Sequence, residues 1–163
     1  MKALSKRDPP APRPPSDSMV ETTHLVLPTD INALGTAFGG RIMQWMDIAA
    51  AVAAGRHCGT PAVTVALDDV HFAHPIRLGD VVVLLACVNF AGRTSMEVGV
   101  RVEREDPANR VRTHCLSGYF TFVAVNGSGD PIAVPPIAAR SERERIRFTA
   151  AEARRQQRLA RLR

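Results

Sequence analysis

An aspartate lies in the middle of the most apolar helical segment of this chain. The run from Ile42 to Ala54 contains only two polar side chains, Gln44 and Asp47. Burying an unpaired carboxylate is costly, so this aspartate requires a polar partner, contact with water or a chemical task. A carboxylate held on a helix can activate water as a general base, or it can attack an electrophile as a nucleophile.

A pair of glycines, Gly39 and Gly40, lies seven residues before this aspartate, where the helix is predicted to begin. The first N–H groups of a helix have no intrahelical partner, and glycine allows an oxygen atom to approach the backbone closely. Gly40 and Asp47 are nearly two turns apart and close to one face. They would supply a base or nucleophile and donors for a developing oxyanion, which hydrolysis at a carbonyl requires.

A plainer interpretation of the same residues stays open. Gln44, Asp47, Ala51 and Gly55 follow one another at helical spacing, so they could form a solvated stripe on an otherwise buried helix. The glycine pair could be no more than a turn or a helix start.

The surrounding segments predict the frame that positions these groups. The helix is expected from Phe38–Gly40 to Gly55, preceded by one strand and followed by four, at residues 22–27, 62–72, 81–90, 94–103 and 111–125. Short links between the four later strands favour antiparallel neighbours, because a parallel crossover needs a dozen or more residues. The sequence therefore predicts an α+β fold in which an antiparallel sheet wraps one long central helix.

Composition divides the 163 residues into three parts. Residues 1–18 hold five of the twelve prolines and are expected to be a disordered arm, whereas residues 19–136 have the composition of a globular domain. Residues 137–163 form an arginine-rich tail that could be helical. Within it, residues 140–163 contain nine arginines and three glutamates, so the net charge of +5 comes from the tail. Nucleic-acid binding through this tail rests on charge alone and is not expected.

The three cysteines, Cys58, Cys87 and Cys115, are widely spaced and include no CxxC pair. We expect reduced and mostly buried thiols and no metal site. No apolar run approaches the roughly 20 residues that span a bilayer, so we expect no contact with a membrane and a cytoplasmic location.

Five segments carry a resemblance to a known family. They are PTDINALGTAFGG at 28–40, MQWMDIAAA at 43–51, VTVALDDVHFAHPIRLGDVV at 63–82, AGRTSMEV at 91–98 and FTFVAVNGSGDPIAVP at 120–135. In this order and spacing they resemble the acyl-CoA thioesterases of the hot-dog fold, specifically the YciA-like and brain-type acyl-CoA hydrolases. The chain departs from many relatives after the helix aspartate, where it has Ile48 followed by three alanines instead of Gly-Gly or Gly-Ala.

The resemblance implies hydrolysis of acyl-CoA to a fatty acid and CoA, without a metal or redox cofactor. It gives Asp47 the role of general base or nucleophile, and it brings Asn32 into the site from a partner subunit. The backbone of Gly39 and Gly40 lies where the thioester carbonyl is polarised. Without the resemblance, Asn32 would be interpreted as a turn residue.

The resemblance also implies a CoA site and an assembly. Arg93 would meet a phosphate, and the hydroxyls of Thr94 and Ser95 would hydrogen-bond CoA, since arginine suits phosphate geometry. Two copies would form a dimer with shared active sites, and three such dimers a hexamer.

Other functions remain as alternatives. The first is a hot-dog protein that binds or senses acyl-CoA without turnover. The second is a hydratase or dehydratase, which usually requires a histidine that the helix motif lacks. The neighbouring Asp68 and Asp69 are predicted to face opposite ways on a strand, so that one of them could be buried and paired. A catalytic role for them is a minor alternative.

Overall fold

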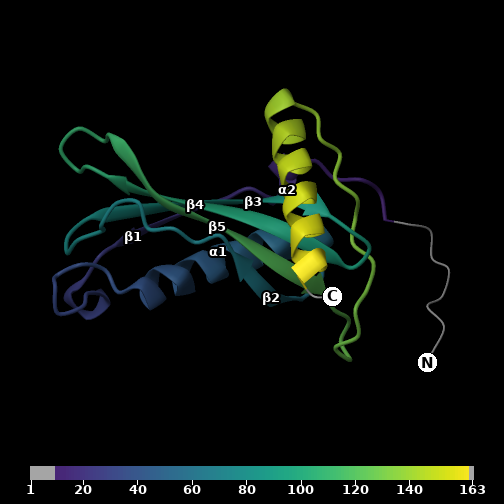
Figure 1. Cartoon of the computed structure of the whole chain (residues 1–163), viewed down its shortest axis with the longest axis horizontal. Coiled ribbons are helices and arrows are strands. Elements are labelled where there is room, and N and C mark those ends of the chain that lie inside the picture. Colours follow the sequence, from purple (N-terminus) through teal and green to yellow (C-terminus); the bar gives the residue numbers. More distant parts are fainter. Residues whose placement is uncertain (1–9, 162–163) are drawn as a thin grey trace.

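A five-stranded antiparallel sheet and the long helix α1 make up the body of the molecule (Figure 1). The computed structural model describes residues 10–161. The elements in chain order are the 3-10 turn η1 (Pro15–Ser18), β1 (Val20–Leu25), the 3-10 turn η2 (Pro28–Asp30), α1 (Gly39–Cys58), β2 (Ala62–Asp68), β3 (Val81–Ala91), β4 (Ser95–Glu105), β5 (Arg112–Ala124) and α2 (Glu142–Arg161).

The strand order is β1-β3-β4-β5-β2, and every neighbouring pair is antiparallel. Strands β3, β4 and β5 form a meander, whereas β1 and β2 lie at opposite edges of the sheet. Because α1 connects these two edge strands, it must cross the whole sheet and pack on one of its faces. This arrangement confirms the predicted α+β hot-dog architecture.

Small residues let α1 lie close to the sheet. Ala49, Ala50 and Ala53 on the helix are at most 1% exposed. On the sheet side, a Cβ atom at Gly118 of β5 would lie 2.9 Å from Cε of Met46. The predicted alanine-rich helix and a glycine in the facing strand therefore set the distance between the two layers.

The predicted ends of one helix and one strand are wrong by three or four residues. The helix continues past Gly55 to Cys58 and ends at Gly59, which has φ +72° and donates its N–H to the Gly55 carbonyl. The strand predicted over 62–72 ends at Asp68, because Asp69 adopts φ +54° and turns the chain out of the sheet. Glycine composition alone does not show which of two nearby glycines adopts the left-handed conformation that ends a helix.

Residues 10–18 were expected to be disordered, and the structure differs. Arg13 pairs with the segment that follows β5, since its N–H donates to the Pro136 carbonyl and its own carbonyl accepts from Ala138 N–H, both at 2.9 Å. Its guanidinium donates to the His57 carbonyl at 2.8 Å and so satisfies one of the free carbonyls at the end of α1. The remainder of the predicted arm, residues 1–9, lies outside the described residues.

Ser18 fixes the same segment to the sheet. Its side chain is fully buried, donates to the Pro15 carbonyl at 2.8 Å and accepts from the Val88 N–H at 2.9 Å. Long-range partners of this kind explain why a proline-rich composition did not indicate order here.

The possible C-terminal helix is present as α2, which crosses the strands steeply (Figure 1). It packs on the face of the sheet opposite α1: Ala151 is fully buried, and the Phe148 ring lies 5.1 Å from the Phe90 ring. Arg154 reaches down to the buried Glu97 with an N···O distance of 2.7 Å. Across residues 10–161, neither helix combines the length and the apolar composition that crossing a membrane requires.

The cysteines are free thiols, as predicted. Cys87 and Cys115 are buried and Cys58 is partly exposed. Burial raises the pKa of the Cys87 and Cys115 thiols, because the thiolate loses hydration there. These two cysteines act as small apolar residues of the core.

A buried histidine at the end of α1 predicts a loss of stability in acid. His57 is fully buried; its Nε2 lies 2.8 Å from the Pro135 carbonyl, and Nδ1 has no partner among the described residues. Burial lowers the pKa of His57 below its usual value. The unfolded chain, in which a histidine titrates near pH 6.5, then binds more protons than the folded one. The free energy of unfolding is therefore expected to have its full value above about pH 6.5 and to decrease as the pH is lowered further.

Urea unfolding between pH 5 and pH 8 would measure this dependence. His57→Gln is expected to reduce the slope, although the burial of His24 lowers its pKa as well and leaves part of the slope. The exposed His71 provides the matched control, His71→Gln. An unchanged slope in folded His57→Gln would contradict the assignment.

Candidate active site

The loop before α1 is held by a buried aspartate that the sequence analysis missed. Asp30 is 8% exposed; its carboxylate accepts from the Leu27 N–H at 2.9 Å and pairs with Arg41 Nε at 3.0 Å. Its backbone carbonyl accepts from the Phe38 N–H at 2.8 Å. One residue therefore ties the end of η2 to the first turn of α1 and fixes the position of the helix start.

The two glycines begin α1, as predicted. Among the described residues, the N–H groups of Gly39 and Gly40 have no acceptor, and the preceding Phe38 provides no side-chain cap. A Cβ at Gly40 would lie 2.6 Å from the Phe38 ring, and one at Gly39 would lie 3.5 Å from the Phe72 ring. The unpartnered N–H groups and the rings of Phe38 and Phe72 thus lie together at the helix start, where an oxygen atom of a ligand can approach the backbone.

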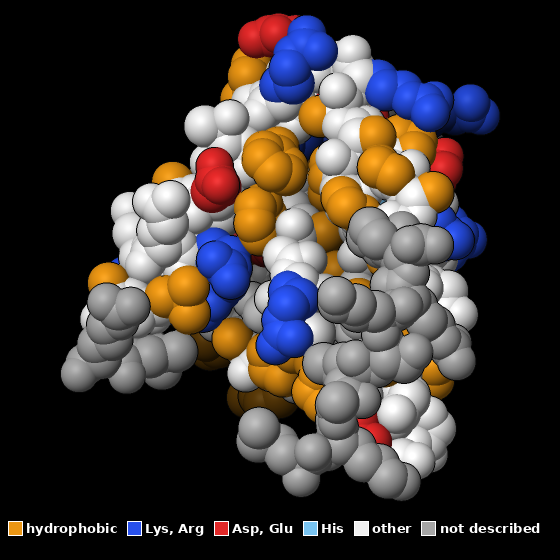
Figure 2. Space-filling model, turned by 90° about the vertical axis from the view of Figure 1, so that its right-hand side faces the viewer, with side chains coloured by type: hydrophobic (Ala, Val, Ile, Leu, Met, Phe, Trp, Pro, Cys, Tyr) orange, Lys and Arg blue, Asp and Glu red, His pale blue; other side chains and the backbone are white. Residues whose placement is uncertain are grey.

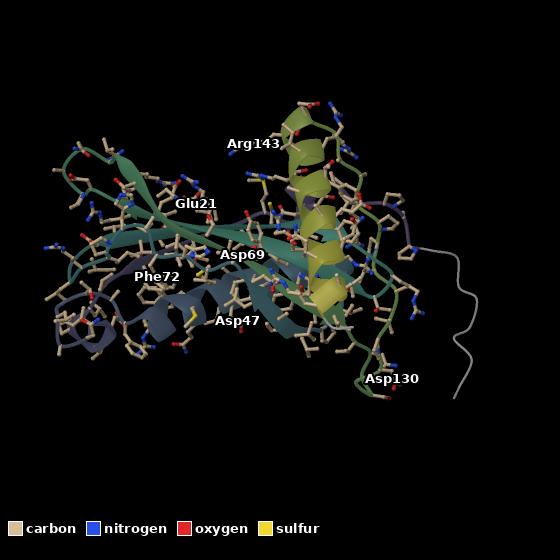
Figure 3. All side chains as sticks on the ribbon, in the orientation of Figure 1. Glu21, Asp47, Asp69, Phe72, Asp130 and Arg143 are labelled. Atoms are coloured by element: carbon tan, nitrogen blue, oxygen red, sulfur yellow. The ribbon has the colours of Figure 1, made fainter. Side chains whose placement is uncertain are left out.

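A cavity of about 320 Å³ opens beside this helix start. It is lined by residues 36–37, by Ile42 and by residues 72–76. Figure 3 shows Phe72 next to the N-terminal half of α1, with Asp47 farther along the helix. The lining is apolar apart from Thr36 and His74, which suits an organic ligand.

Asp47 lies in the middle of α1 and has one close partner. Its Oδ1 accepts a hydrogen bond from Thr64 Oγ1 at 2.6 Å. Thr64 belongs to β2, at a point where the pairing register of β2 and β5 shifts between Thr64 and Ala66. Such an irregularity re-aims side chains, so the edge strand presents its hydroxyl to the helix carboxylate. Thr64 was not singled out from the sequence, because the contact joins elements 17 residues apart.

The alternative of a solvated stripe is compatible with the single chain. Gln44 is exposed, and Asp47, Ala51 and Gly55 are half-buried. Asp47 is therefore neither sealed in the core nor freely solvated: it lies at the uncovered side of α1 and is anchored there by a hydroxyl. Along the helix axis it is about 10 Å from Gly40.

Asn32 is engaged within its own loop in this chain. Its Oδ1 accepts from the Leu34 N–H at 2.9 Å, and its Nδ2 donates to Thr36 Oγ1 at 2.9 Å. This is the turn role that its residue type predicts. An amide nitrogen carries two hydrogens, so a second donor remains for another partner.

Arg93 and Thr94 lie in the turn between β3 and β4, and Ser95 is the first residue of β4. In Figure 1 this turn is at the end of the sheet opposite the start of α1. The pairing agrees, because Ser95 lies opposite Val123, next to the start of β2. Within one chain the structure therefore does not bring these three residues to Gly39 and Gly40.

A band of exposed apolar side chains borders the aspartate. On the edge strand β2, Val63 is 48% and Val65 is 56% exposed, and on α1 the side chains of Ile48 and Val52 are 55% and 43% exposed. Exposed apolar residues on an unpaired strand edge are typical of a surface that another chain covers.

Comparison with known proteins agrees with this architecture. The family model of the thioesterase superfamily matches residues 34–110. The uncharacterized acyl-CoA thioester hydrolase YkhA of Bacillus subtilis is 38% identical over 128 residues, which cover 78% of this chain and 74% of that protein. The structure of an apo-hexameric acyl-CoA thioesterase has a TM-score of 0.89 at 38% identity and covers 93% of this chain and 97% of its own.

An acyl-CoA hydrolase from Staphylococcus aureus, solved with butyryl-CoA, CoA and CoA disulfide, has a TM-score of 0.87 at 35% identity, with 91% of each chain covered. Further structures of that hydrolase carry alanine in place of an asparagine, an aspartate or a threonine, and these positions follow one another at intervals of 15 and 17 residues. With these similarities in sequence and fold, the chain belongs to the thioesterase superfamily of hot-dog proteins, together with the acyl-CoA thioester hydrolases that it matches.

Proposed function

We propose that this protein hydrolyses acyl-CoA thioesters to a fatty acid and free CoA. The observation that carries the proposal is a helix carboxylate, Asp47, held by the Thr64 hydroxyl on the uncovered side of α1 in a thioesterase fold. The reaction as proposed uses water and the side chains of the protein, and it requires neither a metal nor a redox cofactor.

Asp47 acts on the thioester in one of two ways. As a general base it takes a proton from water, whose oxygen attacks the carbonyl carbon; as a nucleophile it attacks that carbon itself and forms an acyl anhydride that water then cleaves. In both routes the C–S bond breaks and CoA leaves as a thiolate that gains a proton. The Thr64 hydroxyl donates to one carboxylate oxygen and so leaves the other oriented toward the reacting atom.

The sequence intervals support these assignments. Asn32, Asp47 and Thr64 follow one another at 15 and 17 residues, the intervals of the three positions changed to alanine in the S. aureus hydrolase. Thr64 therefore joins the candidate residues as the group that orients Asp47.

The start of α1 supplies the second requirement. The unpartnered N–H groups of Gly39 and Gly40 lie beside the cavity, where they can donate to the thioester oxygen as negative charge develops on it. Because Asp47 is about 10 Å farther along the helix, one chain alone does not place both groups on one carbonyl. The site is completed by a second subunit, which contributes Asn32 and, with it, the start of its own helix.

The assembly that brings these groups together is a homo-oligomer. Of the two sheet edges, β2 exposes Val63 and Val65 on either side of Thr64, whereas β1 exposes Glu21 and Thr23 and only one apolar side chain, Leu25 at its end. The apolar edge is the better surface for pairing with a second copy, and it also carries Thr64. We therefore place the dimer contact along β2 and the uncovered side of α1, with dimers assembling further into a hexamer.

Release of thiol from short, medium and long acyl-CoAs, with and without EDTA, tests the function directly. We expect hydrolysis that EDTA does not change, with the panel defining the preferred acyl length. Tight binding of acyl-CoA by the intact oligomer without any thiol release would instead support the alternative of an acyl-CoA-binding or sensing protein.

A charge on the proposed dimer edge is expected to dissociate the oligomer. Val65→Lys places a cation on an apolar contact, where burying it is strongly unfavourable. Light scattering should show a smaller species, and hydrolysis should fall together with the molar mass because the sites are shared. Val111 is 59% exposed before β5 and far from this edge, so Val111→Lys provides the matched control. An intact oligomer in Val65→Lys would refute the assignment of the interface to β2.

A further inference from the structure

The C-terminal half of α2 is fastened to the sheet by two ion pairs. Arg154 donates to both carboxylate oxygens of Glu97, at 2.7 and 3.2 Å, and Arg158 donates to Asp68 at 2.7 Å. These arginines are neutralised by buried or half-buried carboxylates, and they fix how the helix is rotated over the sheet.

Arg155, between these two, points to a different place. Its Nε lies 3.7 Å from the position that a Cβ at Gly92 would take, and its guanidinium lies 5.7 Å from the centre of the Phe90 ring. Among residues 10–161 it has no carboxylate within 4.0 Å. Its charge is therefore held beside the turn between β3 and β4 and is not compensated there.

Other unsatisfied groups meet at the same turn. Ser95 Oγ lies 3.5 Å from the same Gly92 point, and among the described residues neither this hydroxyl nor that of Thr94 takes part in a hydrogen bond. Arg93 in the turn is exposed and likewise has no carboxylate partner within the described part of the chain. The end of the molecule seen in Figure 2 carries several basic side chains set among apolar ones.

A phosphate group requires hydrogen-bond donors and space. The two guanidinium groups and the two hydroxyls provide the donors, and the glycine leaves the space. We propose that Arg155 of α2, together with the turn Gly92–Ser95, binds a phosphate of the nucleotide end of the acyl-CoA substrate. This inference rests on the proposed function, and it adds to the turn a residue from the arginine-rich tail. Gly92 is part of the site, because a Cβ there would contact both Ser95 Oγ and Arg155 Nε and so occupy space that glycine leaves open between them.

The proposal is tested by comparing an acyl-CoA with the pantetheine thioester of the same acid, which lacks the phosphates. Arg155→Ala is expected to raise the KM for acyl-CoA about tenfold or more, the loss typical of one charge-assisted hydrogen bond. Since the pantetheine thioester offers no phosphate to this arginine, its KM should not change, and the difference between the two KM values should become smaller. Arg155→Lys should restore part of the difference. Arg143→Ala, at the exposed start of α2, is the matched control and should leave the ratio unchanged.

Calorimetric titration with CoA and with adenosine 3′,5′-bisphosphate separates the possible sources of the phosphate. Weaker binding of both ligands to Arg155→Ala supports the proposal. Weaker binding of the bisphosphate with an unchanged KM for acyl-CoA would assign the site to a free nucleotide and overturn the substrate assignment. Unchanged binding of both ligands overturns the site itself. Failure of the wild-type protein to hydrolyse either thioester would instead contradict the proposed function, whatever the titrations show.

Discussion

Asp47→Ala is expected to lower kcat for acyl-CoA hydrolysis by about a hundredfold or more while the protein stays folded and assembled. The carboxylate is the only acidic side chain on α1, and its one hydrogen-bond partner in the described structure is Thr64. Because it lies on the uncovered side of the helix, its removal should disturb packing little. Thiol release under saturating substrate, with light scattering and thermal unfolding on the same samples, measures both parts of the expectation.

The matched control is Gln44→Ala, one turn earlier on the same side of α1, which should keep nearly full activity. Thr64→Val should show an intermediate loss, because the carboxylate remains but is less well oriented. Intact-protein mass spectrometry after rapid quench distinguishes the two routes, since only the nucleophilic route forms an acyl anhydride on Asp47. Activity within a few-fold of the wild type in folded, oligomeric Asp47→Ala would rule out both routes.

The second large effect concerns stability. Arg154→Ala is expected to lower the free energy of unfolding by about 3–5 kcal/mol, because it leaves the Glu97 carboxylate buried without its counter-charge. The Glu97 side chain is 1% exposed, and the guanidinium that it binds also lies 3.6 Å from the centre of the Tyr119 ring. Chemical denaturation at fixed protein concentration measures the loss, since oligomer formation also contributes to apparent stability.

A double variant separates the missing charge from the missing packing. Glu97→Gln combined with Arg154→Met removes both charges and keeps most of the volume, so it should recover a large part of the stability. Arg145→Ala breaks the exposed pair with Glu142 on the same helix, and its cost should stay below about 1 kcal/mol. An Arg154→Ala cost as small as that of Arg145→Ala would show that water reaches Glu97.

Much of the fold followed from local patterns. The order of elements along the chain, the long central helix and the antiparallel pairing of β3, β4 and β5 came from apolar runs separated by short links, and these features are confirmed. The short link between β2 and β3 was expected to join neighbouring strands, and this is wrong, because β2 pairs with β5 at the far edge of the sheet. The errors fall where one residue type has two local roles: Gly55 continues the helix whereas Gly59 ends it. Asp69 was predicted on a strand but adopts a left-handed conformation, which few residues other than glycine adopt and which no periodicity indicates.

The candidate site was predictable only in part, for a physical reason. Asp47 stands out because a carboxylate is unusual in an apolar helix. Thr64, Asp30 and Arg155 have residue types that are common at surfaces and in turns, and only contacts with distant parts of the chain give them a role. The same holds for Asp68: the sequence indicated that one of Asp68 and Asp69 is paired without indicating which, and Arg158 from α2 binds Asp68.

The bridge between Arg13 and Ile137 has a consequence for biosynthesis. Arg13 leaves the ribosome early, whereas its backbone partners emerge only after all five strands. In a nascent chain that has already formed the sheet, Ser18 can hold this segment to Val88, but the backbone of Arg13 lacks its partners until residues 136–138 have been translated. The pairing of Arg13 at this end of the molecule is thus coupled to translation of the segment that follows β5, so that residues 13 and 136–138 are secured together in one late step.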